Sequence, residues 1–405
     1  MGLCICSGSI YETPASFGAS HLLKNMAFKS TVNRSHECIA QEIENLEATV
    51  TASASREQMV YTYEGVMGPF VPIMAEVLID CVRNPVFLDQ EITEQVQKIK
   101  AEIGEAANDP HSLLLEALHS TGFSGALANP LLASESSICR LNSAVLKEFV
   151  AENYTAPRMV LAALGADHWK VVSIAERLLS DLPKVVRPEE PKSVYVGGEY
   201  RCQAESSNAH VALAFEVPGG WEKEKVHLTL PVLQMLVGGG GSFSAGFLGK
   251  EMYSNRRVLN EFPQIKAFSA FSSVYNNTGL FGIQATSSPA FVCKTIDLAA
   301  RELLALASSG QVDQGELDQA KASTRSAVLT NLYGKLTVED IGRQILTYGQ
   351  RKPIGQFLEI IDDITVEDIV SLTKKIVSSP LTMASWGDVR HVPSYESVSS
   401  KFRSL

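Results

Sequence analysis

The sequence has no long apolar run, no basic excess and no paired pattern of cysteines, and each absence argues against a class of protein. No window approaches the stretch of about 18 apolar residues that crosses a bilayer as a helix, so we expect no membrane span. The net charge of −10 argues against a general nucleic-acid binder, which would carry a basic face. The seven cysteines are scattered and odd in number, which indicates free, mostly buried thiols in a reducing compartment.

Catalytic motifs are also absent. A zinc peptidase site on one helix needs two imidazoles four residues apart with a carboxylate between them. At the comparable position this chain has His21, Lys24 and Asn25. An ammonium cannot act as a general base and a neutral amide is a poor zinc ligand, so we expect no catalytic residue and no metal ligand. The simpler interpretation of His21 is a helix residue with an ordinary hydrogen bond. The Gly-Lys pair at 249–250 is followed by a glutamate, which argues against a phosphate loop.

What the chain does contain is a run of four glycines directly after an apolar, helix-compatible segment at 228–237. Glycine is costly to order and free in backbone angle. The run therefore indicates either a flexible connection between elements or a mobile loop that an extended peptide can approach closely. For the second alternative, the candidate substrate-binding residues are Gly238, Gly239, Gly240, Gly241, Ser242, Phe243, Ser244, Gly246, Gly249 and Lys250.

The order of the expected helices and strands occurs twice along the chain. A helix, a turn and a long polar-faced helix lie at 70–107, and the same order recurs at 291–332. A capped helix followed by a strand lies at 141–165 and recurs at 364–387. Residue identity between the copies is low, but the order and spacing agree. The chain therefore predicts two domains of one architecture.

In each half the strands and helices are segregated rather than strictly alternating, which favours an α+β layer fold. We expect a first domain at 1–182 and a second at 197–405, each a mostly antiparallel sheet with packed helices. The segment 183–196 carries prolines and mixed charge, which is typical of a linker. The altered zinc motif falls in the first domain and the glycine-rich run in the second.

Three blocks, at 8–31, 53–59 and 238–254, resemble the α subunits of mitochondrial processing peptidases, which belong to the pitrilysin-like metallopeptidases. The resemblance covers essentially the whole chain. It is similar to the plant form, which is also a core subunit of respiratory complex III. The family has two similar α+β domains joined by a linker, and the resemblance therefore implies the same architecture that the internal repeat predicts.

The resemblance further implies a non-catalytic subunit that binds presequences through its glycine-rich loop. Zinc and hydrolysis would belong to a β subunit, so this chain would hold no cofactor. The later glutamate of the zinc motif would fall near Glu102 or Glu105. The implied partners are the β subunit, presequence peptides and other complex III subunits, with no nucleic acid. The implied location is the mitochondrion, on the matrix side of the inner membrane.

The chain also departs from the family pattern. Where the family loop continues with Gly-Pro and later a further Gly, this chain has Phe247-Leu248 and Glu251. From the resemblance we expect the family's first strands, which precede residue 8 in relatives, to be missing, and we therefore expect an unpaired edge in the first sheet. The altered loop favours an alternative, a mainly structural core subunit of complex III with little peptide binding, whereas the intact run at 238–245 favours the presequence-binding subunit. A third hypothesis is an independent metallopeptidase.

Overall fold

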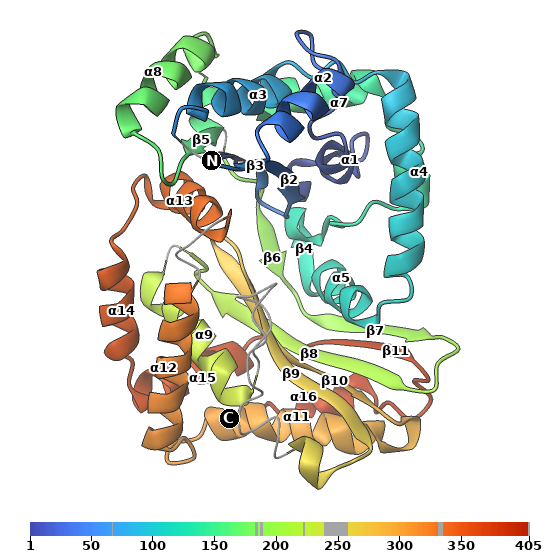
Figure 1. Ribbon diagram of the computed structural model, residues 1–405. Helices are drawn as coiled ribbons and strands as arrows, with labels where there is room; N and C mark the ends of the chain where they lie inside the picture. The colour runs from blue at the N-terminus through green and yellow to red at the C-terminus, as the bar shows by residue number, and fades with distance from the viewer. Residues whose placement is uncertain are drawn as a thin grey trace. The chain divides into compact units, whose positions relative to one another are not determined.

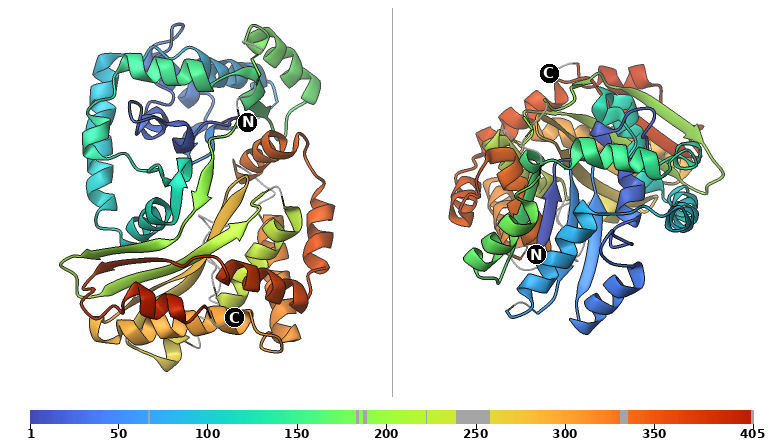
Figure 2. Two further views of the ribbon diagram at one scale, coloured as in Figure 1. Left: turned by 180° about the vertical axis from the view of Figure 1, so that it is seen from behind. Right: turned by 90° about the horizontal axis from the view of Figure 1, so that it is seen from above.

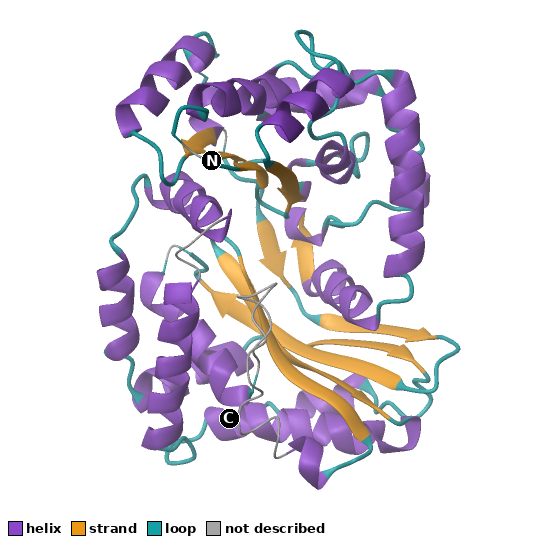
Figure 3. Ribbon diagram, in the orientation of Figure 1, coloured by secondary structure: helices purple, strands orange, loops and turns teal. Residues whose placement is uncertain are grey.

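The computed structural model describes residues 1–66, 68–182, 185–186, 189–221, 223–238, 258–330 and 335–403. The chain divides into two compact units, each a sheet with helices packed on it (Figures 1 and 3). Within the described ranges no helix is both long and apolar enough to cross a membrane. Each unit combines three segments of the chain. Unit 1 is Met1–Asn108, Gly125–Ser193 and Asn331–Arg351, and unit 2 is Asp109–Ser124, Val194–Thr330 and Lys352–Leu405.

Unit 1 is built on an antiparallel sheet with the strand order β2-β3-β1-β5. Its strands are β1 (Gly2–Ile5), β2 (Thr49–Ala54), β3 (Met59–Glu64) and β5 (Met159–Ala162). Its helices are α1 (Ala19–Asn25), α2 (His36–Asn45), α3 (Val71–Arg83), α4 (Asp89–Ala106), α6 (Glu135–Ile138), α7 (Ser143–Asn153), α8 (His168–Leu179) and α13 (Lys335–Tyr348).

The two faces of this sheet are covered by different helices. Side chains alternate across a strand, and along β1 the buried Leu3 and Ile5 join the core that contains residues of α3. Cys4 points to the opposite face, where α13 packs. A methyl group at Gly342 of α13 would lie 2.1 Å from the Cys4 sulfur, so glycine is what permits this close approach.

Unit 2 is built on a five-stranded sheet with the order β7-β11-β8-β10-β9. Its strands are β7 (Gly198–Gln203), β8 (Ala209–Pro218), β9 (Ile265–Val274), β10 (Thr278–Ser287) and β11 (Thr382–Gly387). Its helices are α5 (Pro110–Gly122), α9 (Glu224–Val237), α11 (Val292–Leu306), α12 (Gln314–Thr330), α14 (Ile354–Asp362), α15 (Val366–Val377) and α16 (Tyr395–Ser400). A short sheet of β4 (Phe123–Gly125) and β6 (Ser193–Tyr195) contains residues assigned to both units.

The main core of unit 2 lies between its sheet and helices α9, α11, α12 and α15. Val211, Leu213 and Phe215 of β8 point into this core. The residues between them on the strand are alanines, and α5 packs on that opposite face. Figures 1 and 2 show α11 and α5 on opposite faces of the sheet.

Each sheet is thus completed by a helix that is distant in sequence. Unit 1 receives α13, which packs on β1 and β5, and unit 2 receives α5, which packs on β8 and β11. The pair β1 and β5 and the pair β8 and β11 occupy matching places in the two sheets. Each unit therefore receives one helix from the half of the chain that forms most of the other unit, and we call this the exchange of α5 and α13. The linear domains 1–182 and 197–405, with a linker at 183–196, remain a prediction, because the compact units follow this exchange rather than a single cut in the chain.

The α+β class and the internal repeat are confirmed. The helix pairs α3–α4 and α11–α12 match, as do α7–β5 and α15–β11. Asn142 caps α7, and Thr365 forms a capping box with Asp368 at the start of α15, as the sequence indicates. The two larger sheets are mostly antiparallel, and among their described strands β7 and β11 form a parallel pair.

Strand β7 is not indicated by the sequence, because its polar, mostly exposed residues show no apolar alternation. In the described part of unit 1, β2 and β5 are the two edge strands of the sheet, and an unpaired edge caused by missing first strands stays a prediction. The expectation of mostly buried thiols is wrong: all the cysteines are free, but only Cys4, Cys6 and Cys81 are buried.

Candidate functional site

The candidate site of unit 1 is organised around the short helix α1. The helix follows Gly18, whose φ of 92° lies in the left-handed region that favours glycine. The buried carboxylate of Glu12 accepts hydrogen bonds from the backbone N–H groups of Gly18 at 2.8 Å and Ser20 at 2.7 Å. Burial raises the pKa of Glu12 to about 7, and these hydrogen bonds oppose the rise. Glu12 therefore fixes the start of α1.

His21 is the functional side chain that α1 turns inward. It is 3% exposed, and both of its ring nitrogens have partners. The Ala133 backbone N–H donates to Nδ1 at 3.3 Å, so Nδ1 must be unprotonated. Nε2 then carries the proton and donates to the Glu102 carboxylate at 2.9 Å. Burial lowers the pKa of His21, with the hydrogen bond to Glu102 opposing this, so we assign a neutral imidazole.

Lys24 completes the cluster from the next turn of α1. Its ammonium lies 3.4 Å from the same Glu102 oxygen that His21 contacts. Burial by itself would raise the pKa of Glu102, but the hydrogen bond from His21 and the charge of Lys24 lower it below its usual value. Glu102 is therefore an ionised carboxylate with two donors already bound to it. Of the two glutamates that the sequence offered, Glu102 faces His21 and Glu105 is exposed.

These residues do not fit a zinc ion. A zinc-bound imidazole needs a free lone pair toward the metal, and the His21 nitrogen that faces Glu102 carries a proton. Asn25 turns its amide back onto its own helix and donates to the His21 carbonyl at 3.2 Å. Among the described residues, no group of three or more His, Cys, Asp or Glu side chains could hold a metal. The cluster is a hydrogen-bonded ion pair in which both His21 and Lys24 contact Glu102, and it does not have the arrangement of a zinc ion with an adjacent general base.

A cavity of about 650 Å³ adjoins the cluster within unit 1. It lies between α1, α2 and β2, and Lys24 and Asn25 form part of its wall. Phe28, Ile39 and Ile43 give it an apolar lining. β2 is an edge strand of the described sheet. An extended chain could therefore pair with β2 and place a side chain in the cavity, which is a binding geometry rather than a catalytic one.

The glycine-rich segment falls mostly outside the described residues. Gly238 is described: it ends α9 with a φ of 95°, and its N–H bonds back to Gln234 and Met235. Glycine suits this position because the chain leaves the helix in a left-handed turn. The other candidate residues, Gly239, Gly240, Gly241, Ser242, Phe243, Ser244, Gly246, Gly249 and Lys250, lie outside the described residues, and their binding role stays a prediction.

Sequence reasoning missed three parts of this site: Glu12, the Ala133 N–H that fixes the His21 tautomer, and the cavity beside α1. The six-residue spacing between Glu12 and Gly18 is a weak signal, because acidic residues near helix starts are common. The other two contacts depend on tertiary packing and leave no pattern in the sequence.

Comparison with known proteins agrees with this geometry. Residues 1–135 match the family model described as insulinase (peptidase family M16), and residues 140–324 match the model described as the peptidase M16 inactive domain. The chain is 61% identical to the mitochondrial-processing peptidase subunit alpha of Solanum tuberosum, over 100% of this chain and 81% of the relative. It is 30% identical to the human cytochrome b-c1 complex subunit 2, over 97% of this chain and 86% of the relative.

A chain in the solved structure of complex III2 from Candida albicans shares the fold. The TM-score is 0.80, with 21% sequence identity, over 99% of this chain and 93% of that chain. The two M16 family models together match residues 1–135 and 140–324, and the potato relative matches over the whole of this chain. The chain belongs to peptidase family M16, in the group of the mitochondrial-processing peptidase alpha subunits.

Proposed function

We propose that this chain acts as the non-catalytic α subunit of a mitochondrial processing peptidase. It would hold the presequence of an imported precursor while a zinc-bearing β subunit cuts it. The observation that carries the proposal is the ion pair between Lys24 and Glu102. In this pair the lysine ammonium lies beside the glutamate that the family resemblance places as the later zinc ligand. Binding functions remain available to such a chain, and metal hydrolysis does not.

The substrate class is supported by charge. Presequences are rich in arginine and amphipathic, and a chain with a net charge of −10 favours their approach through long-range attraction. The edge strand β2 and its neighbouring cavity offer main-chain hydrogen bonds and an apolar pocket. The glycine-rich segment after Gly238 is the second proposed contact. The proposed location is the mitochondrion, on the matrix side of the inner membrane.

The test is reconstitution with a β-type subunit and a fluorescent presequence peptide. We expect the two chains to co-purify, and we expect deletion of residues 239–249 to weaken peptide binding while assembly is kept. Glu102→Gln should leave the cleavage rate unchanged, because Glu102 serves the ion pair and not the reaction. Unchanged peptide affinity after the deletion would contradict the loop's role, and cleavage lost in an assembled Glu102→Gln complex would contradict the non-catalytic assignment.

A second candidate function is a structural core subunit of complex III. Its support is the 30% identity to a human cytochrome b-c1 subunit and the shared fold with a complex III2 chain. Under this alternative the chain would co-migrate with complex III on native gels, and the purified complex would bind presequence peptide no better than an unrelated protein does. Peptide binding with the expected loop dependence would favour the first proposal, even if the chain also resides in complex III.

A further inference from the structure

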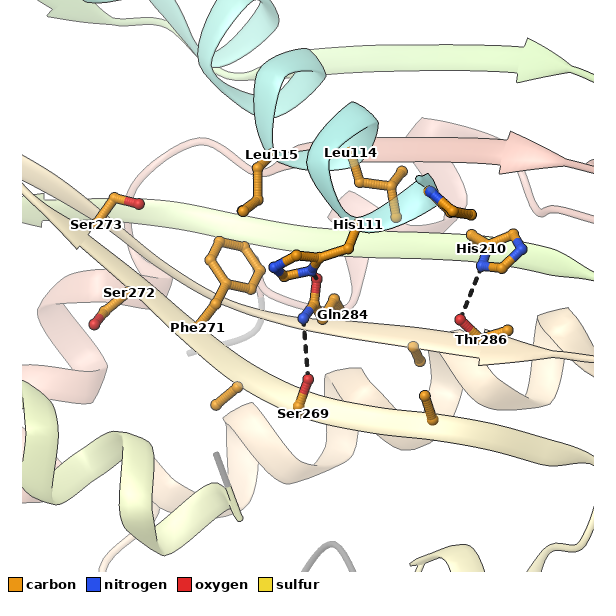
Figure 4. Close-up of a pocket in the computed structure, with 14 residues that line it drawn as sticks. His111, Leu114, Leu115, His210, Ser269, Phe271, Ser272, Ser273, Gln284 and Thr286 are labelled. Carbon is orange, nitrogen blue, oxygen red and sulfur yellow. Dashed lines mark hydrogen bonds between the residues drawn. The ribbon is translucent and has the colours of Figure 1, made fainter. Parts of the chain in front are cut away.

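Unit 2 contains a cavity of its own, of about 390 Å³. It lies between the first turns of α5 and the open face of β9 and β10, beside the start of β8 (Figure 4). A volume of this size is within the usual range for small-ligand pockets. None of the residues used in the α1 cluster or the glycine-rich segment lines it.

The cavity exists because α5 covers only part of its sheet face. Among the described elements, the helix packs chiefly on β7, β8 and β11, and only its first turns, at His111, reach Gln284 on β10. Phe268 and Ala270 of β9 point into the core. Phe271 points to the other face and lies over Gly282, where a methyl group would come within 2.9 Å of its ring. Phe271 thus forms an aromatic floor for the cavity.

The polar groups of the cavity are held in place by one another. The ring nitrogen Nδ1 of His111 contacts the side-chain oxygen of Gln284, and Gln284 donates through Nε2 to Ser269 Oγ at 3.1 Å. Because the Gln284 oxygen can only accept, Nδ1 of His111 carries the proton of this hydrogen bond. At the other end, His210 Nδ1 lies 2.9 Å from Thr286 Oγ1. Figure 4 shows these side chains along one face of the strands.

Among the described residues, the lining of this cavity contains no Asp, Glu, Lys or Arg side chain. Burial lowers the pKa of His210, and the positive charge of Lys266 adds to this, so His210 is neutral near pH 7. A charged ligand would lose its hydration here without gaining an opposite charge. The cavity therefore selects an uncharged occupant with hydrogen-bonding groups and some apolar surface.

The spacing of the lining favours an extended chain. Ser269, Phe271 and Ser273 alternate along β9, and Gln284 and Thr286 alternate along β10. Side chains on one face of a strand repeat every two residues, or roughly 6.6 Å, which is also the repeat of an extended peptide. We propose that this groove binds an uncharged stretch of extended peptide, with an apolar side chain on Phe271 and polar groups bonded to His111, Gln284 and Ser269.

The identity of the peptide rests on the proposed function. If the chain holds presequences, then this groove takes their uncharged hydroxyl-bearing and apolar stretches, and the arginines bind elsewhere. The occupant is thus a segment of the same substrate.

The direct test uses the assembled complex of this chain with its β-type partner and a synthetic peptide. The probe is a stretch of Ser, Thr and Leu that carries one benzophenone side chain and is flanked by arginines. After irradiation, mass spectrometry locates the cross-links. We expect them on β9, on β10 or in the first turns of α5. Cross-links confined to other parts of the chain would overturn the groove but leave the proposed function standing, whereas no binding of the peptide to the complex would count against both.

A variant pair measures the contribution to affinity. Ser269→Tyr fills the groove, and we expect it to weaken peptide binding about tenfold, which corresponds to about 1.4 kcal/mol. Ser207→Tyr makes the same change at an exposed position of unit 2 outside the groove, and should leave affinity unchanged. Circular dichroism and thermal unfolding establish that both variants fold. Equal affinities of the two variants would overturn the proposal, and the cross-linking on the unmodified chain decides the question if Ser269→Tyr does not fold.

Discussion

The ammonium of Lys24 on α1 lies 3.4 Å from the carboxylate of Glu102 on α4, and Lys24 stands where a zinc motif on α1 would have its carboxylate. The same oxygen accepts a hydrogen bond from His21 at 2.9 Å. The cation beside the Glu102 carboxylate is therefore a lysine side chain of the same protein. The ion pair is half exposed, so its contribution to stability is small, and its main consequence is for the kind of chemistry that the site can support.

This arrangement predicts what is needed to recover metal binding. Lys24→Glu together with Asn25→His restores two imidazoles four residues apart, a carboxylate between them, and Glu102 as the third ligand. We expect about one zinc per chain by elemental analysis after dialysis. The affinity should be weak, because zinc on His21 Nε2 would move a proton to Nδ1, toward the Ala133 N–H. The control adds His21→Ala to the double variant and should lose the metal. Stoichiometric, tight zinc in the unmodified chain would contradict our interpretation of the cluster.

The buried Glu12 predicts a pH dependence of stability. Its pKa rises from 4.5 to about 7 on folding, chiefly because of burial. The folded state therefore binds a proton more tightly than the unfolded state, and this stabilisation is complete below about pH 4.5 and lost as the pH rises through 7. We expect the free energy of unfolding to fall by up to about 3 kcal/mol between pH 5 and pH 8.

Urea unfolding at both pH values measures the change. Glu12→Gln should flatten this dependence, since the amide does not titrate and can still accept a hydrogen bond from a backbone N–H. Glu105→Gln, at an exposed position of α4, is the matched control and should leave the slope intact. A slope that is the same in Glu12→Gln and in the unmodified chain would show that another group dominates this pH range.

Two glycines in helices predict opposite outcomes for one substitution. In α13, a methyl group at Gly342 would lie 2.1 Å from the Cys4 sulfur, so Gly342→Ala should force α13 away from β1 and cost about 1–3 kcal/mol. In α4, Gly104 has no heavy atom near its added methyl, so Gly104→Ala should stabilise by about 0.5–1 kcal/mol through lower backbone entropy of the unfolded chain. Chemical denaturation measures both, and a stabilising Gly342→Ala would mean that α13 does not pack as described.

The buried carboxylate of Asp80, which is far from the α1 cluster in sequence, predicts a large loss of stability when it is replaced. Burial by itself would raise the pKa of Asp80, but its hydrogen bonds lower it below the usual value. Asp80→Asn should therefore lower the free energy of unfolding by about 2–3 kcal/mol, because the amide cannot accept a hydrogen bond from every donor around it. Those donors are Thr31, Asn33, Arg34 and Asn84.

The matched control for Asp80 is an exposed ion pair. Asp181 pairs with Arg83 at 2.9 Å in an exposed position. Asp181→Asn removes the same charge from a solvated surface, and we expect no measurable change in the midpoint of thermal unfolding. If both variants unfold like the unmodified chain, then the network around Asp80 does not stabilise the loop that it joins to α3.

The local elements could be predicted from the sequence where they follow periodicity and capping. The helices after Asn142 and Thr365 are cases in which the side-chain pattern and the cap chemistry agree. β7 could not be predicted, because an exposed edge strand needs no apolar alternation. The exchange of α5 and α13 between units could not be predicted either, because apolar periodicity shows that a helix has a buried face but not which sheet covers it.

For the site, the sequence could show what is missing but not what replaces it. The residues at 24 and 25 are enough to argue against a zinc motif, because ligand chemistry is local to one helix face. The choice between Glu102 and Glu105 needed the packing of α4 against α1, since both lie on one helix only a few residues apart. The groove beside α5 has no sequence signal, because its lining comes from four separate elements.

The sequence by itself determined the α+β class, the internal repeat and the loss of the metal motif, since each depends on residues that are close together in the chain. The tertiary structure alone decided the ion pair at Glu102, the protonated nitrogen of His21 and the groove on β9 and β10. These features arise where long-range contacts set burial and hydrogen-bond partners, and those contacts are fixed only when the sheets and their exchanged helices have assembled.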